Sequence, residues 1–575
     1  MTAAARPGRG RLRAAAAAVL AAATALSLTS CSDDQAGEDL GENTGHPAYV
    51  VSSPLETTNA ASLTGASTNA ELISGRVYPA VYTPGPNGQM IPNTDLASTQ
   101  LLPGAKRKVL YDIAPDASFS DGHTVTCDDF YLAVAAGKLD RLFGAQLPWT
   151  DQVESVQCRP GAKRFQLSLV EGAGTRWRQL FGPGEILPAH AIAQRAGVAE
   201  QDLVPLLDAA LPGAGGSGTQ GASGADAAQA AAGATGAEGA EGAAATEISD
   251  AAVPDALREV ARVWRDGFRL SEFDEGLQLG YGPYRVDSVG EHGEVRLVRN
   301  EHYHGAPAEE PTLVVWPPSV DTHALAAQAD VVAADITRTD GSFIDRDNPG
   351  NRYEIHPEVG YLTETLLLGE GGVFATPEDR DAFNACVDQK DVAAESSRVS
   401  GVEVPAVAMH VLNPTDPDAA HVAEVSDVHL GTDQALAGRL KGKTVRIGYM
   451  GPDPRKAAMV ESIRRSCEPA GITVKDVSET TGQLGDLIGV PPAGEDRVDA
   501  VLKAVDPVAE YSALAPGQRG WRALQAAEAG EWRRVRAIPL ASQPRVFATD
   551  REMGNVNVYT GLAGIGWNMD RWRIG

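Results

Sequence analysis

Alternating strand and helix patterns limit the folds open to this chain more than any other feature. The clearest example lies between residues 445 and 474, where three sets of apolar residues mark a strand, one face of a helix and a second strand: Val445, Ile447 and Tyr449; Val460, Ile463 and Cys467; Ile472 and Val474. Apolar spacing of two residues is typical of a strand, and spacing of three or four is typical of a helix. This unit predicts a parallel sheet covered by helices, with ligands favoured at the carboxyl ends of its strands.

Similar signals elsewhere extend the α/β interpretation along the chain. Residues 165–169 alternate between apolar and polar side chains, as a half-buried strand requires. The pattern Thr126-x-x-Asp129 predicts a capping box at the start of a helix, and Thr376 followed by Pro377 predicts another helix start. The chain has 575 residues, of which 43% are apolar. Since a domain usually has about 100–200 residues, we expect an α/β protein with three or more domains or lobes.

The N-terminal segment, residues 1–30, has the pattern of a secretory signal. Basic residues precede the apolar run Ala14–Leu28, which is shorter than the roughly 20 residues of a membrane-spanning helix. The next residues, Leu28-Thr29-Ser30-Cys31, resemble the lipobox of bacterial lipoproteins, in which the cysteine receives lipid. We therefore expect acylation (palmitate) on Cys31, a polar tether over 31–45, and a location on the extracytoplasmic face of the cell membrane. An ordinary secretory signal with a chance cysteine is the alternative.

Four further cysteines form an even set, which permits two disulfides in an exported protein: Cys127, Cys158, Cys386 and Cys467. The sequence leaves three pairings open, and we favour the local pairs Cys127–Cys158 and Cys386–Cys467. Four buried free thiols are the alternative, because free cysteine is a common core residue.

Charge and motifs exclude several classes of function. The formal net charge is −27, which disfavours a nucleic-acid binder because phosphate backbones would be repelled. No Gly-x-Ser-x-Gly or His-Glu-x-x-His motif is present, so we expect neither an enzyme nor a cofactor or metal. A hydrolase built from distant residues is the alternative. His292, His302 and His304 are interpreted as structural, since no carboxylate or cysteine completes a ligand set.

The segment 213–246 is dominated by Gly and Ala and contains no aromatic residue. It cannot bury a core, so it is interpreted as a disordered insertion or linker. It contains Gly213-x-Gly215-x-x-Gly218, but no strand precedes this match, as a dinucleotide site would require. Gly442-Lys443-Thr444 likewise lacks the first glycine of a P-loop.

Two ordered blocks carry a family resemblance. The stretch from Phe119-Ser120-Asp121-Gly122 to Asp129 resembles the F-S-D-G-x-P-L-T-A-x-D signature of family 5 extracellular solute-binding proteins, the oligopeptide- and dipeptide-binding proteins of ABC importers. The second block, Gly282-Pro283-Tyr284 followed by Arg299-Asn300-x-x-Tyr303-His304-Gly305, is similar to the family's G-P-Y and R-N-P-x-Y-W-G. Weaker echoes lie at residues 70–74 and at Ile186-Leu187-Pro188-x-His190. The resemblance implies a two-lobed periplasmic-binding-protein-like fold of type II, with the three subdomains of the peptide-binding class.

The resemblance also implies an organisation of the chain. Lobe I would combine residues 46–88, 180–310 and 536–575, with a second subdomain over 89–179 and a third, large lobe over 311–535. Hinge closure of the lobes around a peptide or peptide-like solute would present the protein, a monomer, to an ABC permease. The alternative is a non-transport lipoprotein of the same fold that regulates mannolipid or lipoglycan synthesis in the cell envelope.

Candidate ligand-binding residues also come from the resemblance. Peptide binders of the family are expected to hold a carboxylate for the ligand's amino terminus in a W-x-x-D-x-x-D-P stretch, of which only Asp506-Pro507 is clear in this sequence. Asp506 is therefore our first candidate, and a surface Asp-Pro turn is the alternative. Thr57, Thr58 and Asn59, and Gly360 with Tyr361, are placed near the cleft by analogy alone.

Overall fold

The computed structural model describes Met1 and residues 39–575, apart from 86–87, 105–106, 175, 212–252, 338–342, 345–347, 349, 489–497, 512 and 516. Residues 43–575 form one compact unit, and the description below concerns that unit. The predicted signal over 1–30, its lipid-anchor residue Cys31 and the predicted insertion over 213–246 lie outside the described residues.

A ten-stranded sheet runs through this unit. Its order is β14-β13-β15-β12-β16-β11-β1-β10-β9-β8. Its strands, in chain order, are β1 (Ala48–Val50), β8 (Tyr284–Val289), β9 (Val295–Arg299), β10 (Thr312–Trp316), β11 (Val331–Ile336), β12 (Tyr353–Leu368), β13 (Thr444–Gly448), β14 (Thr473–Asp476), β15 (Ala500–Val505) and β16 (Ala537–Asp550). The long strands β12 and β16 pair antiparallel over nearly their whole length.

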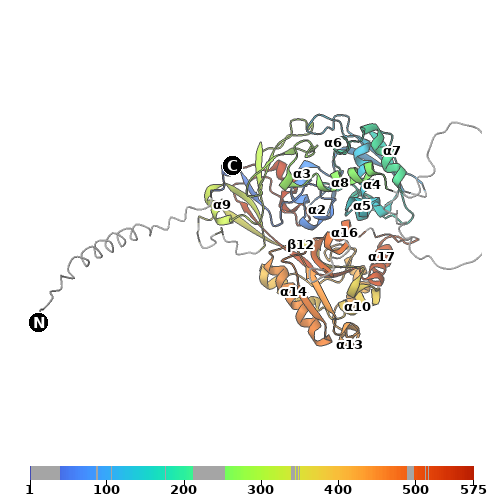
Figure 1. Cartoon of the computed structure of the whole chain (residues 1–575), viewed down its shortest axis with the longest axis vertical. Helices are drawn as coiled ribbons and strands as arrows, with labels where there is room; N and C mark the ends of the chain where they lie inside the picture. The colour runs from blue at the N-terminus through green and yellow to red at the C-terminus, as the bar shows by residue number, and fades with distance from the viewer. Residues whose placement is uncertain are drawn as a thin grey trace, which may run out of the picture. The chain divides into compact units, whose positions relative to one another are not determined.

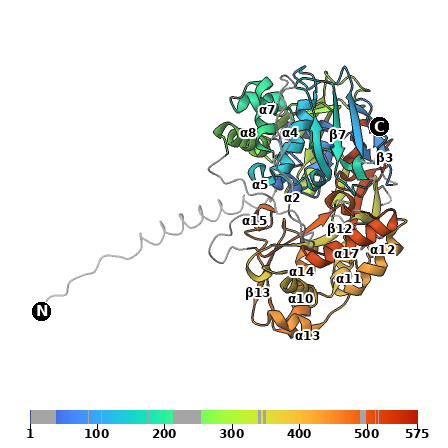
Figure 2. The same ribbon diagram turned by 90° about the vertical axis from the view of Figure 1, so that its right-hand side faces the viewer.

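These two long strands connect two lobes, which are seen above and below β12 in Figure 1 and again in Figure 2. We call residues 43–336 and 551–575 the upper lobe, and residues 363–542 the lower lobe. The upper lobe also holds a four-stranded antiparallel sheet in the order β4 (Ala97–Leu102), β5 (Lys108–Ile113), β7 (Arg164–Leu169) and β6 (Val153–Gln157). A hairpin, β2 (Tyr82–Pro84) with β3 (Met90–Pro92), lies in the same lobe.

Helices cover both lobes. Those of the upper lobe are α2 (Leu63–Thr68), α3 (Glu71–Val77), α4 (Cys127–Lys138), α5 (Asp140–Phe143), α6 (Ala189–Arg195), α7 (Glu200–Ala210), α8 (Asp255–Asp266) and α9 (Thr322–Gln328). Those of the lower lobe are α10 (Pro377–Asn384), α11 (Gln389–Ser400), α12 (Ala419–Ser426), α13 (Gln434–Ala437), α14 (Pro454–Cys467), α15 (Gly485–Ile488), α16 (Pro507–Glu510) and α17 (Trp521–Arg534). Among the described residues, no helix has both the length and the apolar character needed to cross a bilayer.

Each lobe has its own hydrophobic core. The upper core surrounds large aromatic side chains such as Phe130, Phe165 and Trp264, and the lower core includes Phe383 and Trp532. A smaller apolar cluster joins the lobes, in which Leu63 and Ala66 of the upper lobe pack against Leu484, Val498 and Val501 of the lower lobe.

Several local predictions are confirmed. Thr126 and Asp129 form a capping box at the start of α4, and the side chain of Thr376 caps α10. Strands β13 and β14 pair in parallel with α14 between them in the chain, as the 445–474 pattern predicted. Both favoured disulfides, Cys127–Cys158 and Cys386–Cys467, are formed.

The predicted boundary of the third lobe at residue 311 differs from the structure. Strands β10 and β11 pair in parallel with β1, and Leu313 and Val332 belong to the upper core. Residues 312–336 therefore belong to the upper lobe, and the lower lobe begins within β12. The difference arises because the boundary was inferred from the family resemblance, and a resemblance of short motifs does not reveal which distant strands pair with β10 and β11.

Candidate ligand-binding cavity

A cavity of about 340 Å³ lies where the two lobes meet. The upper lobe contributes Pro84, Gly85, Gly88, Met90, Gln179, Val558, Tyr559 and Thr560. Strand β12 contributes Glu358, Val359 and Tyr361, and the lower lobe contributes Thr415 and Asp506. The structure thus brings two of the predicted residues, Tyr361 and Asp506, to one cavity that both lobes line.

Asp506 is held in place by a helix start. It follows the carboxyl end of β15 and is the N-cap of α16, where its Oδ1 accepts hydrogen bonds from the N–H groups of Val508 (2.9 Å) and Ala509 (3.4 Å). Burial raises the pKa of Asp506, and the nearby guanidinium of Arg176 opposes that shift. No described residue donates a hydrogen bond to Oδ2, so this oxygen is free to accept one from a ligand.

Two tyrosines give the cavity neutral polar groups. The backbone N–H of Tyr361 donates to Thr560 Oγ1 (2.9 Å), which fixes β12 against the upper lobe at this point. Burial raises the pKa of Tyr361 and of Tyr559, so both phenols stay protonated and can donate hydrogen bonds. Tyr559 is only 7% exposed, and its hydroxyl has no hydrogen-bond partner among the described residues.

Gly360 has a structural role beside the cavity. A β-carbon at this position would lie 2.3 Å from the backbone oxygen of Gln543 on β16. The β12–β16 pairing changes register between Val359 and Thr363, so the close approach occurs where the two strands pass between the lobes. A glycine is needed there because no side chain fits.

Thr57, Thr58 and Asn59 do not line this cavity. All three are buried: Thr57 donates to the backbone oxygen of Phe268 (3.0 Å), Thr58 to Gln278 Oε1, and Asn59 Nδ2 to the backbone oxygen of Trp264 (2.7 Å). In this conformation their side chains hold the upper lobe together, and the prediction that they contact ligand receives no support from the geometry. These residues were placed near the cleft by analogy with the family, and such an analogy does not show where their side chains point.

Three buried ionisable groups close to Asp506 or Glu71 were not found from the sequence. Glu71 begins α3, and burial together with Glu185 and Asp506 raises the pKa of Glu71 well above its usual value. Lys503 lies on β15, where burial lowers its pKa. Arg176 lies near Asp506. Glu71 falls within the weak 70–74 echo, but nothing in that pattern indicates a buried carboxyl group.

Hydrogen bonds join the lobes in this structure. Arg176 of the upper lobe donates from Nη1 to the backbone oxygen of Tyr511 (2.7 Å) and from Nη2 to that of Val411. Gln146 Nε2 donates to Glu510 Oε1 at 2.9 Å. The lobes are therefore in direct contact.

A second, larger cavity of about 880 Å³ also lies between the lobes. It is bounded by Asp140, Gln146 and Asp151 of the upper lobe and by residues such as Glu510 and Arg536 of the lower lobe. The two ends of helix α16 line different cavities. Its N-cap, Asp506, lines the smaller cavity, and its last residue, Glu510, lines the larger one.

The fold is that of the periplasmic solute-binding proteins, in the class that includes oligopeptide binders. A periplasmic EDTA-binding protein superposes with a TM-score of 0.60 at 15% identity, covering 93% of this chain and 99% of that protein. The oligopeptide-binding protein AppA of Bacillus subtilis, solved with a nonapeptide, gives 0.61 at 12% identity, covering 92% and 99%. The predicted fold class is confirmed, and both of these neighbours are binding proteins.

Among sequence relatives, an uncharacterized lipoprotein of Mycobacterium tuberculosis is 26% identical, with 98% of this chain and 97% of the relative covered. No family model matches the chain.

Proposed function

We propose that this chain is the membrane-anchored substrate-binding component of an ABC importer, which binds a peptide or peptide-like solute between its lobes. The observation that carries the proposal is the cavity lined by Tyr361 and Asp506 from one side and by residues 558–560 from the other. Binding of this kind involves no reaction of the solute. Its free energy comes from buried ligand surface and from polar groups already placed in the cavity.

Contact with both lobes supports a closure mechanism. A ligand that touches one lobe alone has the same affinity for open and closed forms, so it cannot shift their populations. A solute in this cavity would contact β12, Asp506 and the upper lobe together, and would add to the bonds that Arg176 already makes across the gap. The closed form would then be the one that docks on the permease.

Asp506 favours a ligand with an amino group, because its free Oδ2 is an acceptor in the cavity. A cavity of about 340 Å³ lies at the small end of ordinary ligand sites, which measure roughly 300–1,000 Å³. A small peptide or an amino-containing analogue fits these properties better than a long peptide does.

Mass spectrometry of compounds that co-purify with the tag-free mature protein tests this proposal. A peptide or amino-containing solute that also decreases the radius of gyration on rebinding would support it. A lipid-linked glycan would instead support the envelope-regulation alternative, and turnover of the bound compound would contradict a purely binding function.

Anchoring gives a prediction that can be checked independently of the ligand. The relative from Mycobacterium tuberculosis is a lipoprotein, which supports lipid attachment at Cys31. We expect Cys31→Ser to move the protein from the membrane fraction to the soluble fraction, because each buried CH₂ of an acyl chain contributes about 0.8 kcal/mol to membrane binding. Fractionation followed by immunoblotting measures this, and unchanged membrane retention would rule the anchor out.

The Gly/Ala segment gives a prediction of a near-zero effect. Deleting residues 213–246 should leave the melting temperature almost unchanged, because loop-closure entropy changes by only about 0.6 kcal/mol per doubling of loop length. Differential scanning calorimetry of the deletion variant checks this expectation. A large drop in melting temperature would mean that the segment packs against a lobe.

A further inference from the structure

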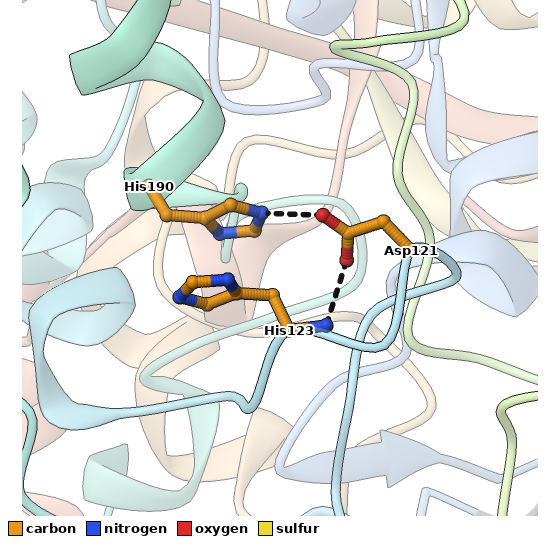
Figure 3. Close-up of side chains that lie close together, drawn as sticks. All are labelled: Asp121, His123 and His190. Carbon is orange, nitrogen blue, oxygen red and sulfur yellow. Dashed lines mark hydrogen bonds and ion pairs between the residues drawn. The ribbon is translucent and has the colours of Figure 1, made fainter.

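Two histidines and two carboxylates meet on the upper lobe, outside the interlobe cavity. Asp121 and His123 lie in the turn before α4, His190 lies in the first turn of α6, and Glu200 begins α7. His123 and His190 are far apart in the sequence, so no motif predicts their meeting. Figure 3 shows the two imidazole rings face to face with the Asp121 carboxylate beside them.

The local structure positions each of these groups. Asp121 Oδ1 accepts a hydrogen bond from the backbone N–H of His123 (2.9 Å), and Gly122 between them adopts a positive φ of 86°. Asp121 Oδ2 lies 3.0 Å from His190 Nε2. The two rings stack with centroids 4.0 Å apart and planes 7° apart. One donor atom from each of Asp121, His123 and His190 lies within 4.8 Å of the others.

We propose that Asp121, His123 and His190 bind a transition-metal ion, with Zn²⁺ as the best match. Two imidazole nitrogens and one carboxylate oxygen are donors that suit Zn²⁺, whereas Ca²⁺ and Mg²⁺ prefer oxygen alone. Two ligands of a tetrahedral zinc ion lie about 3.3 Å apart when each bond is 2.0–2.1 Å. The 3.0 Å between Asp121 Oδ2 and His190 Nε2 is close to that value, and the ion would replace the proton that now lies between these atoms.

Glu200 accepts a hydrogen bond from His123 and so orients its ring for metal binding. Its Oε1 lies 3.2 Å from Nε2 of His123, so Nε2 donates the proton and the lone pair of the ring is left on Nδ1. A carboxylate that accepts from the second nitrogen of a ligating histidine fixes its tautomer and raises its basicity.

Binding requires one small rearrangement. A metal ion is bound in the plane of an imidazole ring, so the His123 ring must leave its parallel stack on His190 for both nitrogens to reach one ion. The His123 side chain is 41% exposed, which gives it room to tilt, and water can complete the coordination. The ion would join the turn at residues 119–124 to α6 and, through Glu200, to α7.

Equilibrium dialysis of the tag-free mature protein in detergent against micromolar ZnCl₂ tests the proposal, with metal measured by mass spectrometry. We expect one zinc ion per chain, loss of that ion in His123→Ala and in His190→Ala, and at least about tenfold weaker binding in Glu200→Gln. His304→Ala is the matched control, because His304 is an exposed histidine outside the cluster, and it should bind as the unaltered protein does.

A second readout distinguishes ligation from general histidine affinity. Co²⁺ in the site should give visible absorption bands that disappear in His123→Ala, a substitution at an exposed position. Unaltered protein that retains no zinc would overturn the proposal. Equal zinc retention by His123→Ala and the unaltered protein would also overturn it.

Discussion

Asp506→Asn is expected to weaken binding of an amino-containing ligand by about 1.5–3 kcal/mol, which is roughly 10- to 150-fold in Kd. The reason is that the variant loses the negative charge at the free Oδ2 position while asparagine keeps an oxygen that can cap α16. Isothermal titration with the co-purified compound measures the change. A neutral ligand should be barely affected.

The control is Asp388→Asn, because Asp388 caps α11 in the same way but lies outside both cavities. It should leave Kd unchanged. Burial raises the pKa of Asp506, so affinity for the amino ligand should also fall as the pH drops through that raised pKa, at a higher pH than an exposed aspartate would show. Equal losses in the two variants would show that capping, and not ligand contact, is the function of Asp506.

Glu364→Ala is expected to destabilise the protein by about 3–5 kcal/mol, the largest effect on stability that we predict. Glu364 on β12 is fully buried and lies 2.5 Å from Arg455 Nη2 in α14, which is itself buried. Removing Glu364 leaves the buried guanidinium of Arg455 with only the longer ion pair to Asp453, at 3.7 Å. Urea unfolding followed by circular dichroism measures the loss.

A double variant separates the charge effect from the packing effect. Glu364→Leu combined with Arg455→Met should recover much of the stability, because both buried charges are then absent. Glu461→Ala is the control, since the Glu461–Arg464 pair is exposed and such pairs contribute roughly 0–1 kcal/mol. If Glu364→Ala and Glu461→Ala cost the same, burial of the first pair is not what stabilises the lower lobe.

Local sequence patterns were sufficient for the secondary structure that depends on neighbouring residues. The capping box at Thr126 and Asp129 and the parallel pair of β13 and β14 follow from interactions within a few residues or within one strand–helix–strand unit. The family resemblance, carried by turn residues such as Asp121 and Gly122, led to the correct fold class. These signals are local, so a single chain displays them.

The candidate site was predictable only in part. Asp506 was predicted because Asp506-Pro507 matches the end of the family's W-x-x-D-x-x-D-P motif. The structure places Asp506 with Tyr361 in one cavity. Thr57 to Asn59 were placed by analogy, and the structure buries their side chains in hydrogen bonds of the upper lobe. Glu71 and Arg176 had no pattern of their own, although both lie near Asp506.

The sequence by itself predicted the α/β class, because apolar periodicity and helix caps act over short distances, and the family resemblance implied the two lobes. The sequence also favoured two local cysteine pairs, and both disulfides are formed in the structure. Only the tertiary structure decided that β10 and β11 join the upper lobe, that Asp506 meets residues 558–560, and that His123 stacks on His190. Each of these depends on contacts between segments far apart in the chain, whose free energy comes from long-range packing that one sequence does not display.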